Sequence, residues 1–77
     1  MNRNRRQGLM EALDKLRKAR DIVDRIADEE QESLDNTPEN LQLTDRWADM
    51  EEALDLLREA IDSMDDAESN ISQVAGG

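Results

Sequence analysis

Apolar residues recur every seven positions along this chain, and no other feature constrains its fold as strongly. Between positions 43 and 75 they form three lines: Leu43, Met50, Leu57, Met64 and Ile71; Trp47, Leu54, Ile61 and Ala75; and Ala53, Ala60, Ala67 and Val74. Apolar spacings that alternate between three and four residues predict a long amphipathic helix that buries one stripe against another helix.

An earlier amphipathic stretch supplies the partner helix. Its stripe consists of Leu9, Ala12, Leu13, Leu16, Ala19, Val23, Ile26 and Ala27, with Ile22 on its flank. The small residues Ala12 and Ala19 fall seven apart, which predicts a close approach of the two helices. Arg20 interrupts the stripe. Either its stem lies along the seam with the charge in water, or it is a buried charge that needs a carboxylate opposite.

The residues between the two stretches predict a hairpin. We expect one domain over residues 9–75, with a helix over about 9–33, a connection over 34–44 and a helix over about 45–73. Residues 1–8 are expected to form a flexible basic arm, and 76–77 a tail.

The connection itself carries helix-start signals. Asn36 or Thr37 before Pro38 predicts a cap followed by a short helical turn, and Thr44 is predicted to cap the second long helix. We expect the leucines of this segment to fold back over the end of the helices; they are Leu34, Leu41 and Leu43.

Several residue types are absent, and their absence narrows the possible chemistry. The chain has no Cys, His, Phe or Tyr and a single Trp, which argues against disulfides, zinc sites of the usual kind and a β-rich fold. Its serines have no base to activate them. The sequence therefore predicts no catalytic residue, no metal ligand and no cofactor. No apolar run is long enough to span a membrane, and a cytoplasmic location is expected.

Charge is distributed unevenly along the chain. Residues 1–27 carry eight basic and four acidic side chains, whereas residues 28–77 carry two basic and sixteen acidic ones, which gives the net charge of −10. The acidic total argues against duplex DNA as a partner. In an antiparallel hairpin the basic half meets the acidic half, with Lys18 expected near Glu59 and Lys15 near Asp62.

The apolar stripes are wider than one hairpin can cover. The fold class predicted is all-α: an antiparallel, coiled-coil-like two-helix hairpin that dimerises into a four-helix bundle. The residues expected to carry self-association are Leu13, Leu16, Val23, Trp47, Met50, Ala53, Leu54, Leu57, Ala60, Ile61 and Met64.

Two charged groups are candidate binding surfaces. An acidic row with three- and four-residue spacing follows one outer face of the second helix: Glu52, Asp55, Glu59, Asp62 and Asp66. It is either a solvated face or a mimic of a phosphate strand. Arg3, Arg5 and Arg6 form either a mobile terminus or a grip for an anionic nucleotide.

The segment Asn36-Thr37-Pro38-Glu39-Asn40-Leu41, followed by Met50-Glu51, Ala53, Leu57 and Ala60-Ile61, resembles a group of short uncharacterised helical proteins of bacteriophages and prophages. That resemblance implies a mobile-element origin, and hence the cytoplasm of a bacterial host, but no activity. Three functional hypotheses follow. The first is a non-enzymatic, self-associating protein-interaction module. The others are an acidic inhibitor of a host defence or nucleic-acid enzyme, in the manner of an anti-CRISPR, and a binder that sequesters nucleotides.

Overall fold

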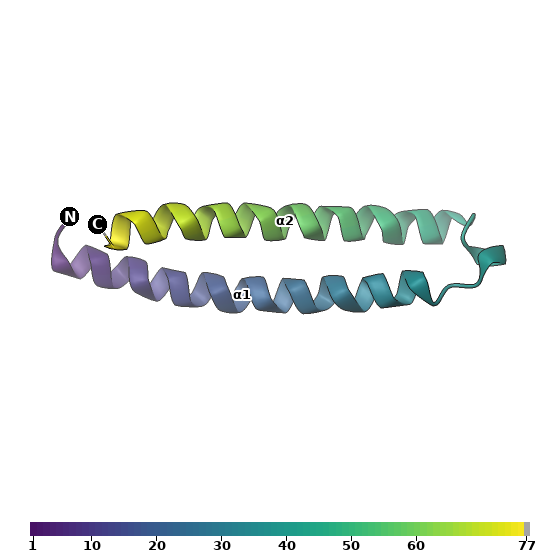
Figure 1. Ribbon diagram of the computed structural model, residues 1–77, viewed down its shortest axis with the longest axis horizontal. Coiled ribbons are helices and arrows are strands. Elements are labelled where there is room, and N and C mark those ends of the chain that lie inside the picture. The colour runs from purple at the N-terminus through teal and green to yellow at the C-terminus, as the bar shows by residue number, and fades with distance from the viewer. Residues whose placement is uncertain (77) are drawn as a thin grey trace.

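Two long helices lie side by side and antiparallel, with both termini at one end (Figure 1). The computed structural model describes residues 1–76 and contains α1 (Arg3–Asp35), the short 3-10 helix η1 (Glu39–Leu41) and α2 (Asp45–Gly76). The Cα positions extend over 59 × 14 × 13 Å, so the hairpin is a narrow rod. The predicted all-α hairpin is confirmed.

The first helix begins earlier than the sequence suggested. Residues 3–8 continue α1 instead of forming a flexible arm, because Asn2 acts as an N-cap: its Oδ1 accepts a hydrogen bond of 2.8 Å from the backbone N–H of Arg5. Gly8 lies inside the helix without a positive φ, and a Cβ added there would meet no atom within 4 Å. At the other end of the chain, Gly76 belongs to α2 and not to a tail, and Gly77 lies outside the described residues.

The connection reverses the chain through local hydrogen bonds. The N–H groups of Asn36 and Thr37 bond to the carbonyls of Glu32 and Leu34, which closes α1 before Pro38. The predicted helical turn is present as η1, although Pro38 itself is its N-cap residue. Thr44 caps α2 as predicted, since its Oγ1 accepts a bond of 3.3 Å from the N–H of Trp47.

The two helices meet along a single seam with a strict heptad pattern. If Leu13 and Leu54 are assigned position a, the a and d positions of α1 and α2 are the residues that lose most exposure. Within the described chain, the buried hydrophobic residues are Leu13, Ala27, Leu34, Leu54 and Ile61. All of these except Leu13 form one cluster, against which Val23, Trp47, Met50 and Leu57 pack.

Two packing predictions are wrong. Leu41 and Leu43 do not cover the end of the hairpin, because they lie outside both long helices and are 47 % and 97 % exposed; Leu34 is buried as expected. Ala12 and Ala19 do not form the close contact between the helices, since both occupy position g and remain exposed. Ala27, at position a and fully buried, occupies that contact instead.

The predicted ion pairs between the helices are also wrong. Lys15 and Lys18 pair within α1, with Glu11 at 3.1 Å and Asp14 at 2.9 Å. The connection occupies residues up to Thr44, so the reversal is centred later than Pro38 and each α1 residue faces a residue further along α2 than expected.

Replacement of Gly8 by Ala tests where α1 begins. Gly8→Ala is expected to raise the free energy of unfolding by about 0.5–1 kcal/mol, because a helical interior favours Ala and the added methyl group meets open space. Thermal unfolding followed by circular dichroism measures the gain, and Gly76→Ala, at the last residue of α2, is the control with a smaller effect. An unchanged melting temperature for Gly8→Ala would contradict a helical residue 8.

Candidate functional site

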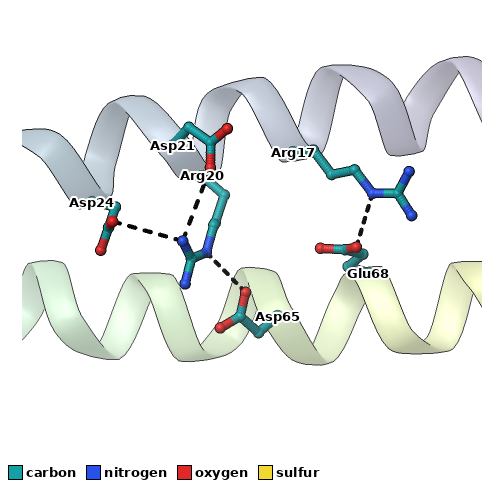
Figure 2. Close-up of polar contacts among 6 residues, drawn as sticks. All are labelled: Arg17, Arg20, Asp21, Asp24, Asp65 and Glu68. Carbon is teal, nitrogen blue, oxygen red and sulfur yellow. Dashed lines mark hydrogen bonds and ion pairs between the residues drawn. The ribbon is translucent and has the colours of Figure 1, made fainter.

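One broad face of the hairpin, the polar face, joins the helices through charged and amide side chains. Arg17 Nε donates to Glu68 Oε1 at 2.8 Å, and Arg20 Nε donates to Asp65 Oδ1 at 3.0 Å (Figure 2). Further along, Arg58 Nη2 donates to Gln31 Oε1 at 3.2 Å. Gln31, Arg58 and Asp65 all occupy position e, so the e positions of both helices lie on this face.

Arg20 is the centre of the polar face. It occupies position a in the seam, and its guanidinium reaches Asp65 across the hairpin and Asp24 at 3.8 Å on its own helix (Figure 2). The hydrogen bond to Asp65, together with the charge of that carboxylate, raises the pKa of the Arg20 guanidinium. The structure thus combines the two interpretations of Arg20: the side chain is partly exposed, and a carboxylate lies opposite it.

The opposite broad face is apolar. Positions e and g flank the seam on opposite sides, so the g positions lie on the face turned away from Arg17 and Arg20, with the c positions beside them. The apolar residues at these positions, which define the apolar face, are Ala12, Ala19, Ile22 and Ile26 of α1 and Ala53, Leu56, Ala60, Ala67 and Val74 of α2. Charged residues at the same positions include Lys15, Glu29, Arg46 and Asp49. Leu56 is 58 % exposed, Ile22 49 %, Val74 48 % and Ile26 41 %. Large apolar side chains exposed along one face are available for contact with another protein surface.

The residues predicted for self-association divide between the seam and the apolar face. The seam holds nine of them within one hairpin: Leu13, Leu16, Val23, Trp47, Met50, Leu54, Leu57, Ile61 and Met64. Only Ala53 and Ala60 lie at position g, on the apolar face. A second copy would therefore meet a surface that the prediction only partly named.

Leu56 and Ile22 are the main residues that the sequence reasoning missed as surface contacts. Both occupy position c, whereas the predicted stripe consisted of positions a, d and g. Leu56 was therefore not recognised, and Ile22 was placed only at the flank of the stripe. The signal was present in the three- and four-residue spacing of Ala53, Leu56 and Ala60, and of Ala19, Ile22 and Ile26.

The acidic row lies on the outer edge of α2. Its five side chains, Glu52, Asp55, Glu59, Asp62 and Asp66, are all exposed, and none forms an ion pair within residues 1–76. From Glu52 to Asp66 the row spans about 21 Å at the helical rise, or one charge per roughly 5 Å. A DNA strand carries one charge per about 3.4 Å, so the row has a lower linear charge density than a phosphate strand.

The three arginines of the predicted arm lie in the first two turns of α1 and point in different directions. Arg3 and Arg5 are exposed, whereas Arg6 occupies position a and its Nε is buried without a hydrogen-bond partner in the described chain. A hollow of about 240 Å³ near this end is lined by Met10, Leu13, Arg17, Ser72, Ala75 and Gly76, and by none of the three arginines.

Trp47 closes the turn end of the seam. It packs against the buried cluster, and its indole Nε1 is buried with no hydrogen-bond partner in the described chain. A hollow of about 640 Å³ beside it includes Leu41, Met50 and Thr37. Trp47 is thus a seam residue that shares a hollow with the exposed Leu41 of the connection.

Comparison of the chain with protein-family models, curated proteins and solved structures finds no match. The resemblance in the Asn36–Leu41 turn therefore stays a prediction. In the described part of the chain, neither helix is long and apolar enough to cross a membrane, and no three acidic side chains are grouped as metal ligands would be.

Loss of Arg20 tests how much the polar face stabilises the hairpin. Arg20→Ala is expected to lower the free energy of unfolding by more than loss of an exposed pair within α1 does, because it removes the packing of the side-chain stem and leaves Asp21, Asp24 and Asp65 without their shared cation. High salt should narrow this difference by screening the carboxylates. Lys18→Ala, which removes one exposed pair within α1, is the control at about 0.3–0.5 kcal/mol. Equal losses for the two variants would contradict a special role of Arg20.

Proposed function

We propose that this protein is a non-enzymatic, self-associating helical module for protein interaction, and that two copies join through their apolar faces into a four-helix bundle. The observation that carries the proposal is the apolar face itself, with Leu56, Ile22, Val74 and Ile26 exposed on one side of a hairpin whose other side is charged. The bacteriophage or prophage origin implied by the turn motif is part of the same proposal.

The small size of the seam supports self-association. A chain this short is near the limit at which one core sustains a fold without disulfides, bound metal or self-association. The described seam buries only five hydrophobic residues. Oligomerisation is one of the few ways in which a small fold with no Cys can gain stability. A second copy would cover the side chains that the hairpin leaves in water.

The dimensions of the apolar face are sufficient for a specific dimer. Along α2 it extends from Ala53 to Val74, roughly 30 Å at the helical rise, and two helices side by side are about 20 Å wide. The footprint is thus roughly 600 Å² on each copy, or about 1,200 Å² in total, at the lower end of stable interfaces. Nearly the whole face must take part, which favours a face-to-face bundle over a contact at one end.

The alternating small and large residues of the apolar face also suit helix packing. Five g positions hold Ala (Ala12, Ala19, Ala53, Ala60 and Ala67), while the larger Ile22 and Leu56 stand at neighbouring c positions. Large side chains of one copy can enter the spaces above the alanines of the other, as in the knobs-into-holes packing of helical bundles.

A second candidate function is inhibition of a nucleic-acid-binding host protein by the acidic row. What supports it is that the five carboxylates are exposed and free of ion pairs within the described residues. In a face-to-face dimer they would stay accessible, because they occupy positions b and f on the outer edge of α2. Their charge density is lower than that of DNA, so we place this candidate second.

Leu56→Asp tests the first proposal. It is expected to weaken dimerisation at least about tenfold, since a carboxylate would be buried without a partner at the interface. Light scattering over a concentration series measures the mass, and circular dichroism measures the helix content. Ser69→Asp adds the same charge at an outer position b of α2 and should leave the dimer intact. A wild-type chain that is monomeric and fully helical at micromolar concentration would refute self-association.

Competition with duplex DNA tests the second candidate. The purified protein should displace DNA from host nucleic-acid-binding proteins, and added salt should weaken the effect. The triple change of Asp55, Glu59 and Asp62 to Lys should abolish it while the dimer persists. The control changes Asp21, Asp28 and Glu32 to Lys, which alters the net charge equally on α1. If both triple variants lost the ability to displace DNA equally, the effect would depend on net charge alone, and the acidic row would not be a binding site.

A further inference from the structure

The register of the hairpin places two c positions, one on each long helix, at the same level. The ion pairs Arg17–Glu68 and Arg20–Asp65 join residues whose numbers add to 85 in each case. The Arg58–Gln31 bond, nearer the turn, joins numbers that add to 89. The two ion pairs lie nearest to Ile22 and give the register of α1 and α2 at that level. By the same register Ile22 of α1 lies level with Ser63 of α2, and both occupy position c. A single axis perpendicular to the helices and in the plane of the apolar face can therefore pass through both positions.

The two halves of the hairpin on either side of Ile22 and Ser63 differ strongly in net charge. The turn half of the hairpin, residues 23–62, carries three basic and fourteen acidic side chains, a net charge of −11. The terminal half, residues 1–21 and 64–77, carries seven basic and six acidic side chains, a net charge of +1. Two copies packed with their turns at the same end would place −11 against −11. Two copies packed with their turns at opposite ends place each −11 half against a +1 half.

Local charges around Ile22 select the same arrangement. Lys15, Ile22 and Glu29 occupy consecutive c positions, each seven residues from the next. A twofold axis at Ile22 lays α1 of one copy antiparallel to α1 of the other, so that Lys15 of each copy faces Glu29 of its mate. Glu29 forms no ion pair within the described chain, and Lys15 pairs there only with the exposed Glu11.

We propose that the dimer is an antiparallel four-helix bundle with its two turns at opposite ends, a twofold axis at Ile22 and Ser63, and reciprocal Lys15–Glu29 pairs between copies. This inference rests on the self-association proposed above and specifies its geometry. Leu56 of each copy then faces the Asn70 region of its mate, because both lie seven residues from Ser63. The exposed Leu41 and Leu43 of the two turns project at the two ends of the bundle.

Distances between labelled turns test the orientation. The chain has no Cys, so Asn40→Cys provides one site for a spin label on each copy. The proposed arrangement puts the two labels roughly 50 Å apart at the helical rise, whereas turns at the same end would put them within about 20 Å. A dimer with the short distance overturns the inference and leaves self-association standing. A monomer overturns both.

Charge reversal gives an independent test of the Lys15–Glu29 contact. Lys15→Glu and Glu29→Lys should each weaken dimerisation about tenfold, because symmetry repeats each change at two contacts. The double variant should recover to within about threefold of the wild type, although it keeps the new repulsion from Glu11 within α1. Lys18→Glu, at the outer position f, is the control with the same charge change and little effect on dimerisation. Failure of the double variant to recover would overturn the proposed pairing.

Discussion

Burial of one narrow seam between α1 and α2 is the interaction on which the rest of this structure depends. Two helices that pack as a pair can bury only their a and d positions against each other. Leu13, Ala27, Leu34, Leu54 and Ile61 are buried in this way, while their seam neighbours stay half in water. So few buried side chains offset little of the conformational entropy lost on folding, which is why we propose that a second copy supplies further burial.

The two broad faces of the hairpin differ in chemistry. On the polar face, Arg17 and Arg20 reach Glu68 and Asp65, and these charged contacts define which residues of α1 and α2 stand level. On the apolar face, alanines at position g leave room and Ile22 and Leu56 at position c project. One face thus joins the two helices through charged contacts, and the other offers the surface that we propose a second copy covers.

Heptad spacing, the Thr44 cap and the short turn before it were sufficient to predict the helical hairpin. The start of α1 was misjudged because Gly8 and the arginines before it are poor helix signals, whereas the single cap at Asn2 extends the helix through them. The register was misjudged because it was counted from Pro38, although the connection continues to Thr44. The exposure of Ala12 and Ala19 also could not be predicted. Both occupy position g, which borders the seam, and the spacing of apolar residues does not tell whether a residue at that position is buried or exposed.

The central claim is that a single hairpin leaves too much apolar surface exposed to be stable alone. Its most direct test is thermal unfolding at two protein concentrations, about 1 μM and 100 μM, followed by circular dichroism. Mass action on a dimer predicts a melting temperature higher by roughly 5–10 °C at the higher concentration. A melting temperature that is the same at both concentrations would contradict the claim.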